Sequence, residues 1–250
     1  MSLFVVGLGT ANPEDCVQLR TQPEFRKASR NMMMSYLAIR QALENHDALD
    51  ESTLGLVLGS SCGELEITRD FLCTLDQSKI ARPLLFQNSL HNATTGFLAL
   101  QLSVTGPSVS VSNRYFTSEC SFEAAELLLK SGSARFCLVI AVESRVPMLE
   151  PGLKAIHSRK DATHELQFSE NAAALLLTCD STLPHLAEIE SVRWSHKVQS
   201  TPRTPPHPFH DSDAISHLIG MFQGSAEKGT LLSIKSDGTQ SEIIWHRSAR

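Results

Sequence analysis

Short apolar runs alternate with helix-like segments along most of this chain, and this alternation constrains the fold more than any other feature. Leu54–Leu58 and Phe136–Val142 are apolar throughout, which is typical of strands that are buried on both faces of a sheet. Between them, Phe122–Lys130 has the spacing of a helix that ends at Ser131 and Gly132. Strands that alternate with helices in this way predict an α/β layered domain.

The same patterns predict the remaining elements. Further strands are expected at Leu3–Gly9, Ser108–Ser112, Asn171–Thr178 and Ala187–Trp194, and further helices at Phe25–Leu43, Glu64–Leu75, Asn92–Leu102 and Ala214–Phe222. Gly229–Ile234 and Ser241–Trp245 flank a Ser-Asp-Gly turn, so we expect them to form a hairpin. Gln199–Asp213 contains four prolines and is expected to be a loop or linker.

Composition and charge exclude several classes of function. The net charge of -5 and the isoelectric point of about 6.1 leave no basic field for nucleic acid or an acidic membrane surface. No apolar stretch approaches the roughly 20 residues of a membrane span, and the N-terminus lacks the features of a signal peptide, so we expect a cytoplasmic protein. The six cysteines form no CxxC pair, so neither a metal site nor a disulfide framework is expected, and nothing in the sequence calls for a cofactor.

Several motifs, in this order and spacing, resemble the β-ketoacyl synthases, whose fold is thiolase-like. The nucleophile region of that family is similar to Gly106–Ser112 (GPSVSVS), the helix at 122–132 (FEAAELLLKSG) and the buried strand that ends in Glu143-Ser144. The upstream runs at 54–75 (LGLVLGSSCGELEITRDFLCTL) and 85–108 (LFQNSLHNATTGFLALQLSVTGPS) resemble the N-terminal half of a ketosynthase group that includes short, chain-length-factor-like members. The resemblance extends from Leu3 to Trp194, and it implies a thiolase-like α/β fold.

The resemblance fails at the nucleophile. In an active ketosynthase this strand leads into an elbow with a cysteine, whose thiol receives the acyl chain from a carrier protein. Ungapped spacing from Gly106 to Gly132 places Tyr115 at that position. A phenol with a pKa near 10 cannot replace the thiol, and its ring fills the space that an acyl thioester needs. The neighbouring Arg114 needs a polar partner if it is buried. Arg114 and Tyr115 either fill the space of a former acyl pocket, or they are substitutions that accumulated after catalysis was lost.

The resemblance also implies that a second half is missing. A full ketosynthase has a second, similar half that supplies two histidines, and no such segment exists in these 250 residues. We therefore expect a ketosynthase N-terminal-like domain at 1–195, and a Pro-rich linker with a short tail at 196–250 that packs on the same domain. The face that the second half would cover must then be capped by this tail or by a partner.

These features together imply a catalytically silent subunit that resembles a chain length factor and is not expected to be an enzyme on its own. It would pair with an active ketosynthase, or with itself, in fatty-acid-like or polyketide (for example polyene) biosynthesis, and would meet the acyl carrier protein through its partner. In relatives the segment that matches Leu84–Thr94 reaches the neighbour's acyl tunnel, and the strand that matches Ser108–Ser112 pairs with its counterpart. The candidate residues for the tunnel wall and interface are Leu84, Leu85, Phe86, Gln87, His91, Asn92, Ser110, Ser112, Arg114 and Phe116.

Two alternatives remain open at this point. Cys120, about one helical turn past the elbow, could act as a displaced nucleophile for acyl transfer or thioester hydrolysis, although the adjacent Glu119 opposes thiolate formation. The chain could also be a stand-alone module that binds an acyl group or a carrier protein. His91 either faces a partner's tunnel or caps the following helix, and Glu143 is expected to make structural hydrogen bonds.

Overall fold

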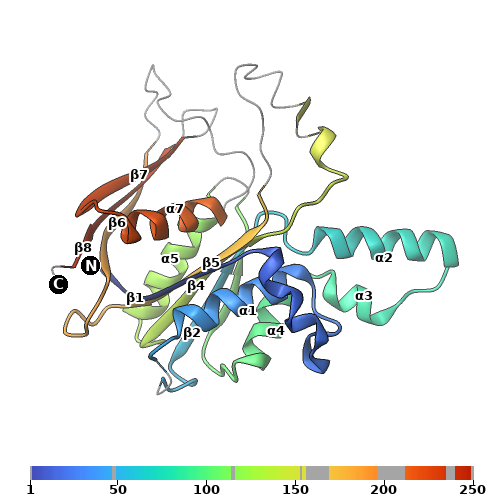
Figure 1. Cartoon of the computed structure of the whole chain (residues 1–250), viewed down its shortest axis with the longest axis horizontal. Coiled ribbons are helices and arrows are strands. Elements are labelled where there is room, and N and C mark those ends of the chain that lie inside the picture. Colours follow the sequence, from blue (N-terminus) through green and yellow to red (C-terminus); the bar gives the residue numbers. More distant parts are fainter. Residues whose placement is uncertain are drawn as a thin grey trace.

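One mixed β-sheet runs through the whole molecule (Figure 1). The computed structural model describes residues 2–46, 49–113, 116–152, 154–155, 169–195, 212–234 and 240–248. Its described strands are β1 (Leu3–Ala11), β2 (Leu54–Gly59), β3 (Ser108–Val111), β4 (Phe136–Glu143), β5 (Asn171–Thr178), β6 (Ala187–Ser195), β7 (Lys228–Ile234) and β8 (Gln240–Arg247). They form an eight-stranded sheet in the order β3-β2-β4-β5-β1-β6-β8-β7. β3, β2 and β4 are parallel to one another, and every other neighbouring pair is antiparallel.

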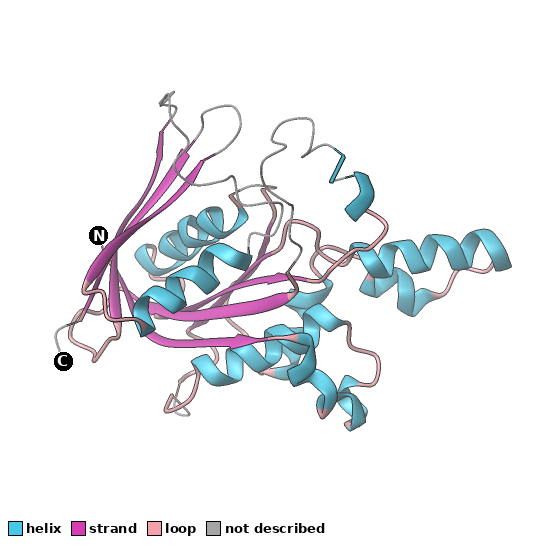
Figure 2. Cartoon of the chain, turned by 45° about the horizontal axis from the view of Figure 1, so that its top comes forward, coloured by secondary structure: helices cyan, strands magenta, loops and turns pink. Residues whose placement is uncertain are grey.

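Helices cover both faces of this sheet and also extend beyond it. The described helices are α1 (Arg30–Ala42), α2 (Leu65–Ser78), α3 (Pro83–Asn88), α4 (Ala93–Gln101), α5 (Thr117–Lys130) and α7 (Ser212–Gln223), with 3-10 turns η1 (Pro13–Val17), η2 (Leu19–Thr21) and η3 (Pro23–Phe25). α1 and α4 lie on one face, and α5 and α7 lie on the other (Figures 1 and 2). α2 and α3 project sideways past the end of the sheet (Figure 2).

The core lies on both sides of β4, as the unbroken apolar run of this strand predicts. All eight residues of β4 are buried, and the strand lies between β2 and β5. On one side, Val139 belongs to an apolar cluster with Phe122 of α5 and Ile215 of α7. On the other, Ile140 belongs to a cluster with Ile39 of α1. The expected central, doubly covered position of this strand is confirmed.

The first long helix begins later than its apolar spacing predicts. The expected helix at Phe25–Leu43 is wrong at its N-terminal end, because Pro23–Phe25 forms a separate 3-10 turn and α1 starts at Arg30. Ser29 sets this start, since its side chain accepts a hydrogen bond from the backbone nitrogen of Met32 at 3.1 Å. The helix expected from Phe122 begins earlier than predicted, at Thr117.

Helix α1 packs unusually closely on β1. A Cβ atom at Gly9 would overlap the carbonyl oxygen of Ala38 and would lie 2.9 Å from the backbone nitrogen of Ala42. A Cβ at Gly7 would similarly overlap the carbonyl oxygen of Ala42. The two glycines therefore allow the helix backbone to contact the strand directly.

The C-terminal segment joins the same sheet. β7 and β8 form the expected antiparallel hairpin, whose turn at 235–239 lies outside the described residues, and β8 pairs with β6. Trp245 is 1% exposed, and its ring contacts Phe222 of α7 edge-on with the centroids 5.1 Å apart. In addition, the Ser241 hydroxyl donates a hydrogen bond of 2.6 Å to the buried carboxylate of Glu119 on α5. Helix α7 and the hairpin thereby contribute to the core, while the domain division at residue 195 stays a prediction.

Candidate functional site

The carboxyl ends of the three parallel strands bring together the loops in which an active site is expected. Ser60–Gly63 follows β2, Asn113 follows β3, and Glu143 ends β4. Open α/β sheets place their ligand sites at this edge. The expected nucleophile position, Tyr115, and its neighbour Arg114 lie outside the described residues.

Glu143 organises the loop after β2. Its carboxylate accepts hydrogen bonds from the Ser60 hydroxyl at 3.2 Å, from the Cys62 backbone N–H at 3.2 Å, and from the Ser61 backbone N–H. The residue is fully buried, so these donors replace the water that a carboxylate otherwise needs. The predicted structural hydrogen bonding of Glu143 is therefore confirmed.

Removal of this carboxylate is expected to destabilise the fold. Glu143→Ala leaves buried N–H and hydroxyl donors without this acceptor, at a cost of about 2–4 kcal/mol in the free energy of unfolding. Chemical denaturation measures the effect. Glu126→Ala is the matched control, because Glu126 makes only a half-exposed ion pair with Lys130 on α5, and a loss of about 0.5 kcal/mol or less is expected there. Equal losses in the two variants would contradict this assignment.

The first turn of α5 carries the second group of polar contacts. Thr117 Oγ1 accepts a hydrogen bond from the Asn113 backbone N–H at 2.9 Å and lies 3.2 Å from Ser61 Oγ. Cys120 is partly buried, and its Sγ accepts a hydrogen bond from Asn113 Nδ2 at 2.9 Å. An amide donates to the sulfur but takes no proton from it, so Asn113 supplies no general base for a reaction at Cys120.

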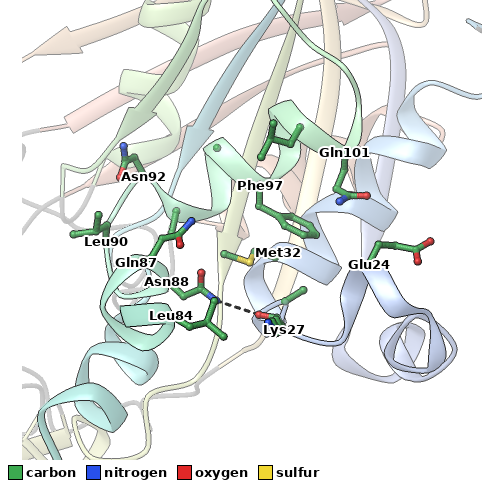
Figure 3. A pocket seen from close by; sticks show the side chains of 14 residues that line it. Glu24, Lys27, Met32, Leu84, Gln87, Asn88, Leu90, Asn92, Phe97 and Gln101 are labelled. Atoms are coloured by element: carbon green, nitrogen blue, oxygen red, sulfur yellow. Dashed lines mark hydrogen bonds between the residues drawn. The ribbon is translucent and has the colours of Figure 1, made fainter. Parts of the chain in front are cut away.

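A cavity of about 490 Å³ lies elsewhere, between η3, α1, α3 and α4 (Figure 3). Its apolar wall comes from Met32, Leu84, Leu90, Phe97 and Leu100, with Ala28, Ala93 and Gly96. Its polar residues are Glu24, Lys27, Gln87, Asn88, Asn92 and Gln101. Asn88 closes one side by donating from Nδ2 to the Lys27 carbonyl at 3.1 Å (Figure 3). An apolar cleft with a few amides and charges is suited to a largely apolar ligand or side chain.

Only some of the residues predicted to form the tunnel wall line this cavity. Leu84, Gln87 and Asn92 line the cavity, whereas Leu85, Phe86 and His91 do not. Phe86 is 54% exposed and packs on Phe71 of α2, with the ring centroids 5.6 Å apart.

The remaining predicted positions lie in three different settings. His91 is exposed, and its ring lies against Gly63, where a Cβ would be 2.8 Å from the His91 Cε1. The hydroxyl groups of Ser110 and Thr95 form a hydrogen bond, with their oxygens 2.6 Å apart. Ser112 is exposed, and Phe116 is 2% exposed at the start of α5.

Sequence reasoning missed Glu64, a carboxylate buried where α2 begins. Its Oε1 accepts hydrogen bonds from the Ser29 hydroxyl at 2.6 Å and from the Thr94 hydroxyl. Burial raises the pKa of this carboxyl group, and the bonds from Ser29 and Thr94 partly offset the increase. The donors are 35 and 30 residues away in sequence, so no local motif identifies the cluster.

Sequence reasoning also missed most of the apolar cavity wall. Met32 belongs to a run of three methionines that reads as core filling, and it is 3% exposed. Phe97 lies on a helix that is apolar on several sides, so its spacing does not show that one face borders a cavity. Among the described residues, no group of His, Cys, Asp and Glu side chains is arranged to hold a metal ion, and no helix is both long and apolar enough to cross a membrane.

Comparison with known proteins identifies the family. The model for the beta-ketoacyl synthase N-terminal domain matches residues 25–154, which is just over half of the chain. The chain belongs to this family. No sequence among the curated proteins matches the chain. Its predicted thiolase-like α/β fold is confirmed by solved structures of ketosynthases and chain length factors.

Three of these structures show how far the likeness extends. The chain matches one chain of the ishigamide ketosynthase/chain length factor with a TM-score of 0.80 and 12% identity, over 100% of both chains. It matches a chain of the ketosynthase ApeO in complex with its chain length factor ApeC from Xenorhabdus doucetiae with a TM-score of 0.67 and 19% identity, over 99% of this chain and 100% of the other. A third match is a chain of the AntDE:AntF complex, a type II PKS acyl-carrier protein with its ketosynthase. Its TM-score is 0.74 and its sequence identity 14%, over 98% of this chain and 99% of the other. At these identities the likeness concerns the fold.

Proposed function

We propose that this chain is a ketosynthase-like subunit without ketosynthase activity of its own, which pairs with an active ketosynthase and shapes its acyl tunnel. The observation that carries the proposal is the tyrosine at position 115, where ungapped spacing from Gly106 to Gly132 aligns the sequence with the cysteine of the family's elbow. A chain with the family fold but without the thiol at this position could still pair through the family's surfaces, but it lacks the family's own group for holding an acyl chain covalently. Two of the matched structures are named for chain length factors, which supports this role.

The projecting helices α2 and α3 support the pairing. They and the turn between them carry several large apolar side chains that are about half exposed or more, and no residue of either helix is buried. Leu72 is 56% exposed, Ile80 66% and Phe86 54%. A projecting apolar surface of this kind is typical of a protein–protein contact. The adjacent cavity, with its largely apolar wall, would face the acyl chain once a ketosynthase covers it.

The open edge of the sheet supports the same partner. β3 is an outermost strand among the described residues, and its one described neighbour is β2. The backbone N–H and C=O groups of β3 that point away from β2 can pair with a strand of another chain, as the resemblance implies for this segment. The carrier protein would then reach this subunit through the ketosynthase, in fatty-acid-like or polyketide synthesis. One matched structure holds a carrier protein together with its ketosynthase.

Co-purification tests the pairing. The chain is co-expressed with a candidate ketosynthase that contains the cysteine nucleophile, and a tag on one subunit is used to recover both. A stable complex is expected, and Leu72→Glu is expected to reduce recovery about tenfold or more, because it places a charge in an apolar contact. Val17→Glu is the control, since Val17 is 65% exposed on η1 and its substitution is expected to leave recovery unchanged. A chain that purifies alone in the presence of the ketosynthase would contradict the proposal.

Covalent labelling tests whether this chain lacks a nucleophile that accepts an acyl group. A reactive acyl-thioester mimic is incubated with the purified complex, and the modified peptides are mapped by mass spectrometry. Label is expected on the ketosynthase cysteine and not on this chain. Stoichiometric label at Cys120 would instead establish the alternative activity, acyl transfer or thioester hydrolysis by a displaced thiol.

A further inference from the structure

The α2–α3 arm, which comprises residues 65–90, is a unit held together by its own contacts. Phe71 packs on Phe86, and the Thr68 hydroxyl donates a hydrogen bond of 3.1 Å to the carbonyl of Ser89. No residue of α2 or α3 is buried, so the arm gains little from packing on the rest of the domain. Its direction is therefore set largely by the bond from Asn88 to the Lys27 carbonyl and by the contacts where α2 joins the domain.

The junction contains one deeply buried carboxylate. Glu64 is 4% exposed and immediately precedes α2. A single oxygen, Oε1, accepts the hydroxyl hydrogens of Ser29 and Thr94. Ser29 caps α1, and Thr94 lies in the first turn of α4. One atom thus ties the arm to both helices beside it.

Further bonds from the start of α1 hold the same junction. Asn31 Nδ2 donates to the carbonyl of Gly63 at 2.8 Å, and Arg30 forms an ion pair with Glu66 at 2.5 Å. Gly63 has a φ of +54°, a backbone conformation that favours glycine. The chain therefore turns sharply into the arm under restraint from α1 on both sides of Glu64.

α1 and α4, which Glu64 contacts, and the arm that it precedes all form walls of the cavity, together with η3. Beside Ser29, the cavity is lined by Ala28 and Met32, and beside Thr94 it is lined by Ala93. The third wall is α3, which belongs to the arm and contributes Leu84 and Gln87, among others (Figure 3). A change in the direction of the arm would move this wall relative to the other two.

We propose that Glu64 is a positioning residue: its hydrogen bonds to Ser29 and Thr94 fix the α2–α3 arm and thereby set the width of the cavity. It does so without lining the cavity itself. The proposal deepens the proposed function and rests on it in one respect, because the arm and the cavity are the surfaces that would face the ketosynthase and its acyl chain. The effect on the free chain does not depend on any partner.

Hydrogen exchange of the free chain, read by mass spectrometry, tests the positioning. In Glu64→Ala, backbone amides at 65–90 are expected to exchange about tenfold faster or more, the factor that loss of buried hydrogen bonds gives. Amides of β4 and β5 are expected to keep their rates within about twofold. Glu64→Gln keeps a carbonyl oxygen for both hydroxyl donors and is expected to restore slow exchange in the arm.

Two results would overturn the proposal. One is an arm that exchanges equally fast in Glu64→Ala and in the unmodified chain. The other is a similar acceleration in β4, β5 and the arm, which would show a general structural role. If Glu64→Ala does not fold, Ser29→Ala and Thr94→Val each remove one of the two bonds and are expected to loosen the arm by a smaller factor.

Binding to the ketosynthase separates this proposal from the proposed function. If the unmodified chain binds the ketosynthase, Glu64→Ala is expected to weaken binding about tenfold or more, while Glu64→Gln binds normally. Faster exchange in the arm with unchanged affinity would refute the link between arm position and pairing. If the unmodified chain does not bind, the proposed function fails, and the exchange result still decides the role of Glu64.

Discussion

Replacement of Gly9 by alanine is expected to destabilise the fold strongly and to lower the yield of soluble protein. The added Cβ would overlap the Ala38 carbonyl oxygen, and backbone atoms of a helix cannot move aside as a flexible side chain can. Helix α1 would have to separate from β1, which also loosens the core around Ile39 and Ile140. The expected loss exceeds about 3 kcal/mol, a large part of the 5–15 kcal/mol that stabilises a typical domain. The yield of soluble protein and the midpoint of thermal unfolding measure it.

The same substitution elsewhere is expected to have the opposite sign. Gly220 lies on α7, is exposed, and has no atom within 4 Å of where a Cβ would stand. Gly220→Ala is therefore expected to stabilise the protein by about 0.5–1 kcal/mol, because alanine favours the helix more than glycine does. A Gly9→Ala variant as stable as the unmodified chain would contradict the close contact between α1 and β1.

Truncation of Trp245 to alanine is expected to cost about 3–5 kcal/mol, as for other fully buried aromatic side chains. The ring lies in a core cluster that also contains Phe222, and its loss leaves a cavity between β8 and α7. Since the cluster also includes Val139 of the central strand, the whole chain is expected to unfold in one transition at a lower denaturant concentration.

This experiment also tests how the domain is divided. Two transitions, of which only one moves in Trp245→Ala, would mean that the C-terminal segment folds separately from residues 1–195. Leu127→Ala serves as the control, because Leu127 is 69% exposed on α5 and its truncation is expected to change stability by less than about 0.5 kcal/mol.

The strands could be predicted because their pattern depends on burial alone. Every residue of β4 is buried, so the apolar run that predicts this strand reflects its place between two helical layers. Helix ends depend instead on single contacts. The apolar spacing after Phe25 continues past Ser29, and only the side-chain cap at Ser29 shows that α1 starts there.

The candidate site could be predicted in part, for a related reason. The resemblance selects the segment from Leu84 to Thr94, and the structure places part of it at the cavity. Which side chains turn inward depends on how α3 lies against α1 and α4. That packing brings together residues far apart in sequence, such as Glu64 and Ser29. The periodicity of a single segment therefore cannot predict these contacts.

The position of β1 in the sheet has a consequence for synthesis of the chain. This strand is made first, but it lies between β5 and β6, so both of its strand neighbours are made late. About 160 residues, from 11 to 171, separate the end of β1 from the start of β5. At about 5–20 residues per second, a ribosome needs roughly 8–32 s to make that stretch. During this time the apolar β1 has no strand to pair with, so the sheet cannot close until most of the chain has been made.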